Sequence, residues 1–262
     1  MLAILLFTAV TSGAAAQGCS FPPPLAAYAH NDYLNPRPLQ DALALGYQGV
    51  EADYVYVRGR LLVAHGRQEA RMSRTLEALY LAPLRDRVRR CGSVQAPGQP
   101  FLLNIEAKEK SEDGYRALRA LLRSYSDLLG TRAQPGPVQV VLVGWHPPLA
   151  FAADSGLPVK VQARLNRSGL KLPDGDPALV GMVSLDYGKT MRWRGSGELS
   201  REDRRTLDQI HQVRRRLPGR IVRAYDVPPD SAVYRMLWKS GVDLIGIKNL
   251  RETARPITRP DY

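Results

Sequence analysis

The sequence of 262 residues is poor in cysteine and histidine, and it lacks a hydrophobic run of membrane-spanning length. Two cysteines and four histidines occur in the whole chain. The apolar stretch at the N-terminus, residues 2–10, is much shorter than the roughly 20 residues that a transmembrane helix requires. With no cysteine and no close pair of histidines in the acidic motifs, zinc is disfavoured as a bound metal.

The first residues carry the pattern of a secretory signal. The apolar run 2–10 is followed by small residues up to Ala16, which predicts cleavage near that position. No lysine or arginine precedes the run, so a buried first helix is the alternative. A lipoprotein anchored through Cys19 is less favoured, because the residues before it make a poor lipoprotein motif. We therefore expect residues 1–16 to be a signal peptide, residues 17–262 to form one domain, and the protein to be secreted or periplasmic.

The two cysteines, Cys19 and Cys91, fit such a compartment, because disulfides persist in an oxidising environment. Cys19 precedes the first predicted strand and Cys91 precedes the third. Both cysteines therefore lie at the N-terminal end of a parallel sheet. We expect them to form a disulfide.

The chain is strongly basic, with 37 Lys and Arg residues against 25 Asp and Glu residues and a net charge of +12. A positive surface favours anionic partners such as phosphate esters, phospholipid head groups or an anionic membrane surface. The alternative is a solvated basic surface without a specific partner. Residues 201–216 mix both signs in a helical pattern, which favours a solvated helix face, and we expect no specific nucleic acid.

Strand-like and helix-like segments alternate along the chain. The strand-like runs are apolar and β-branched, at 25–30, 49–57, 101–107, 138–145, 159–165, 180–187, 220–225 and 244–248. Amphipathic helix patterns lie between most of them, at 38–45, 73–88, 113–129, 200–217 and 231–240. This alternation predicts a single-domain α/β fold, the (β/α)8 TIM barrel. A doubly wound open sheet is the alternative, but residues 30–36 lack the glycine-rich turn that usually follows its first strand.

Ionisable side chains gather where the first three predicted strands end. His30 ends the first strand. Glu51 and Asp53 are two residues apart on the second strand, so both side chains point to one face. Glu106 and Lys108 share a face of the third strand by the same rule. Because barrel enzymes carry their catalytic groups at the C-terminal ends of the strands, we expect these side chains to converge.

A predicted hairpin brings His65 back to the same layer. Residues 57–61 are typical of a tight turn between two strands. A hairpin centred on Gly59 would place Asp53 opposite His65. The spacing therefore predicts a second histidine beside the carboxylates.

The three carboxylates Glu51, Asp53 and Glu106 favour one hard divalent cation, Mg²⁺ or Ca²⁺. Such an ion would neutralise a phosphate group. Of His30 and His65, one would activate the attacking oxygen and the other would protonate the leaving oxygen. Together these residues point to metal-assisted cleavage of a phosphate ester.

The candidates for substrate contact are Asn31, Lys108 and His146, and Lys108 would add positive charge for the phosphate. A structural role is the equal alternative for His146, and His211, which lies in a polar helix, is expected to be inert. Weaker candidates for lining the site are Lys248, Arg164 and Asp186, with Tyr33, Trp145 and Tyr187 as aromatic contacts or simply core residues.

These motifs resemble those of the phospholipase-C-like phosphodiesterase superfamily. That group includes glycerophosphodiester phosphodiesterases, phosphatidylinositol-specific phospholipases C and sphingomyelinase D. Residues 30–43 are similar, more narrowly, to the family of altered inheritance of mitochondria protein 6. The resemblance covers residues 25–110 and implies a (β/α)8 barrel and a divalent cation. By motif it makes His30 and His65 the catalytic pair. The implied metal ligands and phosphate-side lysine are Glu51, Asp53, Glu106 and Lys108.

The function that follows is a metal-dependent phosphoric diester hydrolase acting on a glycerophosphodiester or a phospholipid. Asn31 and Asp32 stand where glycerophosphodiesterases carry Arg-Gly, and Gly66 follows the second histidine as in the sphingomyelinase D pattern. Phosphodiester chemistry is therefore better supported than a glycerol-linked substrate. The alternatives are a catalytically inactive barrel that binds anionic lipid or polyanion, and a phosphomonoesterase.

Overall fold

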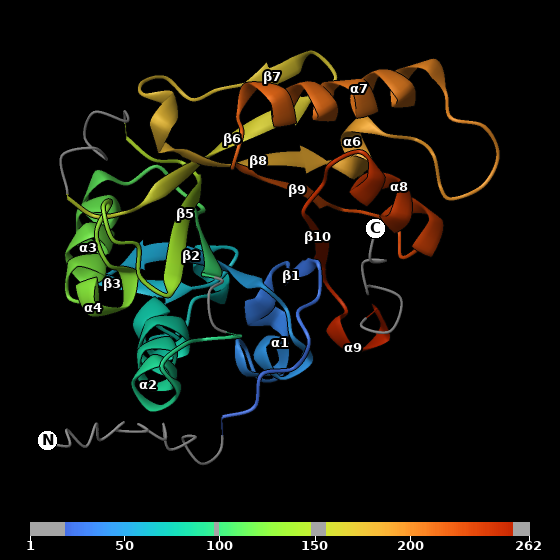
Figure 1. Ribbon diagram of the computed structural model, residues 1–262. Helices are drawn as coiled ribbons and strands as arrows, with labels where there is room; N and C mark the ends of the chain where they lie inside the picture. Colours follow the sequence, from blue (N-terminus) through green and yellow to red (C-terminus); the bar gives the residue numbers. More distant parts are fainter. Residues whose placement is uncertain (1–18, 97–99, 148–155, 254–262) are drawn as a thin grey trace, which may run out of the picture.

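The computed structural model describes residues 19–96, 100–147 and 156–253, so the predicted signal peptide lies outside the described residues. Their strands form one sheet, in which all but β3 and β7 make a closed parallel barrel (Figure 1). The barrel strands, in spatial order, are β1 (Ala27–Ala29), β2 (Gly49–Val57), β4 (Phe101–Ala107), β5 (Val138–Gly144), β6 (Lys160–Asn166), β8 (Val180–Asp186), β9 (Ile221–Tyr225) and β10 (Leu244–Ile247). β1 pairs with both β10 and β2, which closes the sheet. The predicted (β/α)8 barrel is confirmed.

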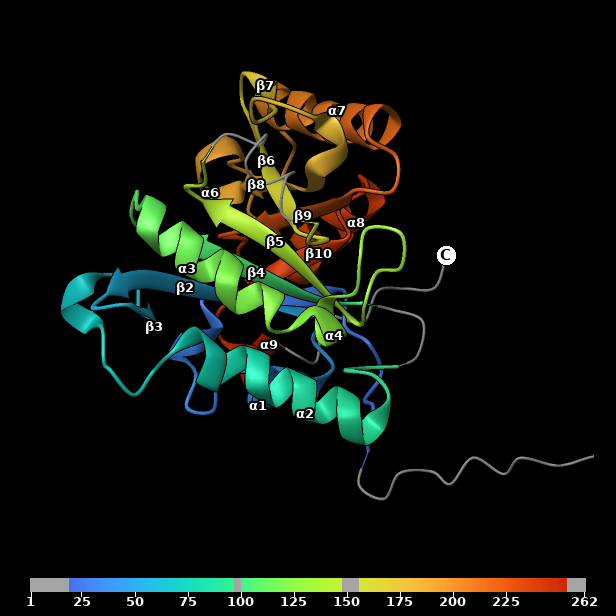
Figure 2. The same ribbon diagram turned by 90° about the vertical axis from the view of Figure 1, so that its left-hand side faces the viewer.

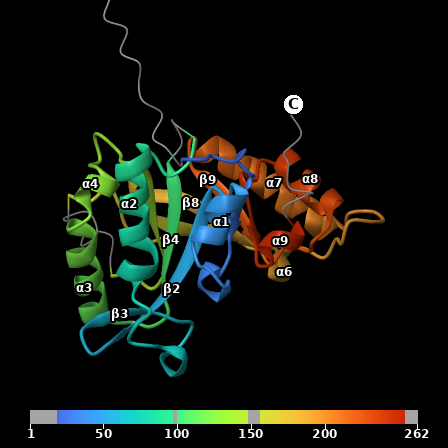
Figure 3. The same ribbon diagram turned by 90° about the horizontal axis from the view of Figure 1, so that it is seen from below.

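Helices surround the barrel (Figures 2 and 3). They are α1 (Gln40–Leu45), the π-helical η3 (Glu77–Leu81), α2 (Ala82–Cys91), α3 (Glu112–Arg123), α4 (Ser126–Leu129), α6 (Tyr187–Thr190), α7 (Arg201–Arg216), α8 (Ser231–Lys239) and α9 (Leu250–Thr253). The side chains of Ser111, Ser200 and Asp230 cap the N-termini of α3, α7 and α8. In the described part of the chain, no helix combines the length and apolarity needed to cross a membrane.

Two short strands and three 3-10 helices complete the described structure. β3 (Arg60–Val63) pairs antiparallel with β2, and β7 (Gly169–Lys171) pairs antiparallel with β6. The 3-10 helices are η1 (Asp32–Leu34), η2 (Arg67–Glu69) and η4 (Pro177–Leu179). Between β6 and β8 the described chain forms only β7 and η4, so this crossover departs from the regular barrel in lacking an α-helix.

The alternation of side chains along each strand divides the core into two parts. Outward-facing residues pack against the helices and form the larger apolar cluster. The smaller cluster is inside the barrel and consists of Tyr28, Leu102, Val141, Val143, Met182 and Leu244. Leu102 and Met182 fill the interior near the N-terminal ends of their strands, whereas Val141 and Val143 lie opposite Asn104 and Glu106 in the polar layers.

The predicted disulfide between Cys19 and Cys91 is present, with the two Cα atoms 5.7 Å apart. It joins the segment before β1 to the last residue of α2. The bridge closes a sequence separation of 72 residues. In the chain-entropy account a loop of this length stabilises the fold by about 4 kcal/mol.

Candidate active site

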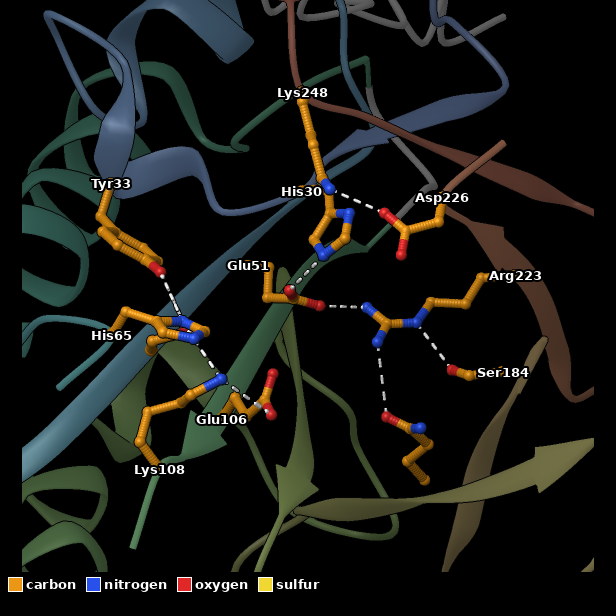
Figure 4. Close-up of polar contacts among 12 residues, drawn as sticks. His30, Tyr33, Glu51, His65, Glu106, Lys108, Ser184, Arg223, Asp226 and Lys248 are labelled. Carbon is orange, nitrogen blue, oxygen red and sulfur yellow. Dashed lines mark hydrogen bonds and ion pairs between the residues drawn. The ribbon is translucent and has the colours of Figure 1, made fainter. Parts of the chain in front are cut away.

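The first three barrel strands place their ionisable side chains at one end of the barrel (Figure 4). His30 follows the last residue of β1. In the parallel pair β2–β4, Glu51 lies opposite Asn104 and Asp53 lies opposite Glu106. The side chains of residues two apart share a face, so both pairs point toward the barrel axis. The convergence predicted for these strand ends is confirmed.

The three carboxylates form a compact cluster, with one oxygen of each residue within 4.8 Å of the others. Glu51 and Asp53 are fully buried, whereas the Glu106 side chain is 24% exposed. Asp53 Oδ1 is buried and has no hydrogen-bond partner among the described residues, and the same holds for both amide atoms of Asn104. Buried oxygens without a partner are costly unless something else satisfies them. An all-oxygen cluster of this kind fits a hard divalent cation.

Three donors meet at the other oxygen of Asp53. Tyr33 Oη donates to Asp53 Oδ2 at 2.8 Å, His65 Nδ1 lies 3.0 Å from it and Lys108 Nζ lies 3.3 Å from it. Lys108 Nζ also donates to Glu106 Oε1 at 3.2 Å. Because a carboxylate only accepts, the His65 contact places a proton on Nδ1, so that Nε2 is the acceptor when the ring is neutral. Asp53 thus fixes the orientation of His65.

The hairpin that carries His65 differs by one residue from its prediction. Its register pairs Tyr54 with Val63, so Asp53 lies opposite Ala64 and the predicted pairing of Asp53 with His65 is wrong. The physical reason is the turn, a two-residue loop of Arg58 and Gly59 with φ of 49° and 76°. A two-residue loop has its centre between these residues and not on Gly59. His65 still reaches Asp53, because its side chain extends from the position after Ala64.

His30 lies on the opposite side of the cluster from His65 (Figure 4). Its Nε2 is 3.3 Å from Glu51 Oε1, and its ring makes an edge contact with Tyr225 at 5.4 Å between centroids. Burial lowers the pKa of His30, and the positive charge of Arg223 adds to this effect, although Glu51 opposes it. The lowered pKa disfavours the protonated imidazole. Its Nδ1 is buried without a hydrogen-bond partner in the described structure.

Arg223 on β9 is a central residue of the site that the sequence did not reveal. Its guanidinium crosses the barrel interior and donates through Nη1 to Glu51 Oε2 at 2.5 Å. It also donates through Nε to Ser184 Oγ at 2.7 Å and through Nη2 to Gln162 Oε1 at 3.4 Å. The side chain is 3% exposed. The alternation of β9 does place Arg223 on the inner face, but that signal names no partner.

The charged groups shift one another's pKa values. Burial raises the pKa of Glu51, but Arg223 and His30 outweigh burial and the net shift is downward. Burial raises the pKa of Glu106, and the nearby charges of Asp53 and Glu51 raise it further. Burial lowers the pKa of Lys108, yet Asp53 and Glu106 more than offset burial and the net shift is upward. Lys108 is therefore a permanent positive charge in the site.

The other predicted contacts surround this cluster. Asn31 follows His30 in a left-handed conformation, with φ of 52°. His146 follows β5, and its Nδ1 lies 2.9 Å from the carbonyl oxygen of Pro147. Their roles in substrate binding stay predictions. Lys248, after β10, forms an ion pair of 2.7 Å with Asp226, so this lysine is part of the rim above His30 (Figure 4).

Residues 22–148 match the family model of the AIM6-like phosphodiesterase domain. This segment contains His30, His65, the three carboxylates and Lys108. Arg223 lies outside it. No curated protein matches the sequence.

Two phosphodiesterases are among the solved structures that share the fold. A glycerophosphodiester phosphodiesterase from Agrobacterium tumefaciens is 15% identical with a TM-score of 0.50, and the match covers 88% of this chain and 97% of that one. A phosphodiesterase from Oleispira antarctica, solved in complex with the product sn-glycerol-3-phosphate, is 13% identical with a TM-score of 0.51, covering 90% of this chain and 96% of that one. At these identities the likeness establishes the barrel fold.

Proposed function

Because this chain belongs, through residues 22–148, to the AIM6-like phosphodiesterase family, we propose that it is a metal-dependent phosphoric diester hydrolase. In this proposal His30 and His65 are the acid/base pair. The observation that supports it best is the position of the two imidazoles, which contact Glu51 and Asp53 from opposite sides of one carboxylate cluster.

The carboxylates of Glu51, Asp53 and Glu106 would hold one divalent cation, Mg²⁺ or Ca²⁺. The unsatisfied Asp53 Oδ1 supports this assignment, since a buried carboxylate oxygen needs a positive partner. Glu51 has only Oε1 to offer, because Arg223 occupies Oε2. When bound, such an ion neutralises the phosphate and stabilises the charge that develops on its oxygens.

The chain's own residues supply the proton transfers. His65 presents Nε2 as an acceptor, and Asp53 stabilises the imidazolium that forms when Nε2 takes a proton. His30 stands on the other side of the cluster, with its Nε2 facing Glu51 Oε1. One histidine, in its neutral form, takes the proton of the attacking oxygen, and the other, in its protonated form, delivers a proton to the leaving oxygen. Lys108 holds a phosphate oxygen beside Glu106.

We propose a small phosphodiester or a phospholipid head group as the substrate, and a secreted or periplasmic location. The structural neighbour that was solved with sn-glycerol-3-phosphate supports a substrate of this size. The disulfide between Cys19 and Cys91 supports an oxidising compartment. The net charge of +12 supports attraction to an anionic membrane surface.

The test is a panel of phosphodiesters and phosphomonoesters, assayed with chelator and after Mg²⁺ or Ca²⁺ is added back. The proposal expects diester turnover that depends on the added ion and little monoester turnover. Binding of the diesters without turnover would favour the inactive barrel that only binds anions. Preferential turnover of monoesters would replace the diester assignment.

A further inference from the structure

The three donors to Asp53 Oδ2 come from three separate connections of the barrel. Tyr33 lies after β1, His65 lies after β3 and Lys108 lies after β4. The segment that carries His65 extends from β3 to the helix η3 on the outside of the barrel. The position of His65 therefore depends on the contacts that join this segment to the connections after β1 and after β4.

One end of this segment is fixed by Arg74. The backbone oxygen of Arg74 accepts a hydrogen bond of 2.7 Å from the amide of Val63 on β3. The guanidinium of Arg74 donates through Nη2 to the carbonyl oxygen of Tyr33 at 2.6 Å. Since the Tyr33 hydroxyl contacts Asp53, Arg74 ties the His65 segment to the connection after β1.

The other end, next to His65, is fixed by Arg67. Its guanidinium forms a bidentate ion pair with Glu109, from Nε to Oε2 at 2.7 Å and from Nη2 to Oε1 at 2.9 Å. Nη2 also donates to the carbonyl oxygen of Tyr56 at 3.1 Å, and the Tyr56 amide donates to Glu109 Oε1 at 3.0 Å. Glu109 directly follows Lys108, so Arg67 ties the His65 segment to the connection after β4.

We propose that Arg67, acting through Glu109, is a positioning residue that holds His65 in register with Asp53 and Lys108. This inference rests on the proposed role of His65 in catalysis. Bidentate Arg–carboxylate pairs fix orientation as well as distance, which suits a positioning role. Reacting groups must be held closely, and a displacement of about 1 Å can lower a rate about a hundredfold.

A contribution to stability does not account for this pair. The Arg67 side chain is 60% exposed, and exposed ion pairs add little to the free energy of unfolding. The chain offers a matched control in Arg116 on α3, which is 61% exposed and pairs with Glu112 and Asp113 outside the barrel. Loss of the Arg116 pair removes a comparable contact without touching the site.

The rival explanation is that Arg67 binds the substrate directly and that Glu109 merely restrains it. The two explanations differ in what Glu109→Gln does. A glutamine keeps the acceptor for the Tyr56 amide but loses the ion pair. If the pair positions His65, Glu109→Gln should lower kcat as Arg67→Gln does. If Arg67 binds the substrate directly, Glu109→Gln should leave Arg67 able to bind it and kcat unchanged.

The experiment is a double-mutant cycle of Arg67→Gln, Glu109→Gln and the double variant, with Arg116→Gln as control. Steady-state hydrolysis of a simple phosphodiester gives kcat and KM. Hydrogen exchange over residues 64–75 is measured in parallel by mass spectrometry. We expect each single variant to lower kcat about tenfold with little change in KM, and the double variant to be no worse than the singles. Exchange in residues 64–75 should be faster in each of them and unchanged in Arg116→Gln.

The inference is overturned if Glu109→Gln keeps full kcat, if the two single effects multiply in the double variant, or if a raised KM replaces the lowered kcat. A failure of the proposed function looks different: the unmodified protein turns over no diester, or His65→Ala has no effect. In that case the exchange measurement decides about Arg67. Unchanged exchange in Arg67→Gln would then refute the positioning role.

Discussion

Arg223 and Glu51 form a buried ion pair across the barrel interior, joining β9 to β2 through a hydrogen bond of 2.5 Å. The pair explains how Glu51 stays ionised although it is fully buried, because Arg223 holds the pKa of Glu51 below its usual value against the effect of burial. It also leaves Oε1 of Glu51 to face His30, whose Nε2 lies 3.3 Å from it.

Arg223→Met should therefore destabilise the protein by about 3–5 kcal/mol, because it leaves a buried charge without a partner. Urea unfolding of the metal-free protein measures this change. Replacing Glu51 as well, in Arg223→Met with Glu51→Gln, should recover part of the lost stability, since the uncompensated charge is then absent. A single variant as stable as the unmodified protein would show that the pair does not stabilise Glu51.

Loss of either histidine should lower kcat by about 10²- to 10⁴-fold, the usual contribution of a general acid or base. A comparison of leaving groups assigns the two roles. The variant that lacks the proton donor should recover activity on a nitrophenyl diester, because that leaving group needs no proton, while the variant that lacks the base should not. If His30→Ala and His65→Ala each lose kcat equally on both substrates, the assignment of one histidine as acid and the other as base is contradicted.

The free energy of unfolding should decrease as the pH rises from about 4 to about 6, because of Asp32, a buried carboxyl outside the metal cluster. Burial raises the pKa of Asp32 to about 6 despite hydrogen bonds from the Leu39 amide and the Tyr80 hydroxyl. The folded state then binds more protons than the unfolded state between the unfolded pKa of 3.8 and the folded value, so this contribution is lost as pH rises through that range. Over this pH range the free energy of unfolding of the unmodified protein should decrease by up to about 3 kcal/mol relative to that of Asp32→Asn. Parallel pH profiles of the two proteins in urea unfolding would refute the shift.

Reduction of the disulfide should lower the free energy of unfolding by about 4 kcal/mol and leave turnover intact. Cys19 and Cys91 lie at the N-terminal side of the barrel, away from the strand ends that carry the histidines. Unfolding of the double Cys→Ser variant measures the effect. A large loss of kcat in the folded variant would mean that the disulfide also maintains the geometry of the active site.

Much of the fold followed from local patterns in the sequence. Each of the barrel strands lies within one residue or two of its predicted range, since buried apolar runs bounded by turns are strong signals. The convergence of Glu51, Asp53, Glu106 and Lys108 followed from the period of two along a strand and from the order of the first strands.

What the sequence did not reveal depended on contacts between distant segments or on turn geometry. The partner of Arg223 is Glu51, far away in the chain, and only barrel closure brings the two together. The hairpin register depended on whether the turn uses one central residue or two, and one residue of error moves the pairing from Ala64 to His65. The ties from Arg67 and Arg74 to neighbouring connections involve exposed or half-buried loops that carry no periodic signal.

We propose that the two histidines and the carboxylate cluster together cleave a phosphodiester. The decisive experiment is phosphorus-31 NMR of a simple diester incubated with Mg²⁺ and the unmodified protein, His30→Ala or His65→Ala. We expect the diester resonance to be replaced by a monoester resonance only with the unmodified protein, and we expect chelator to stop the conversion. Conversion at the unmodified rate by either histidine variant would contradict it.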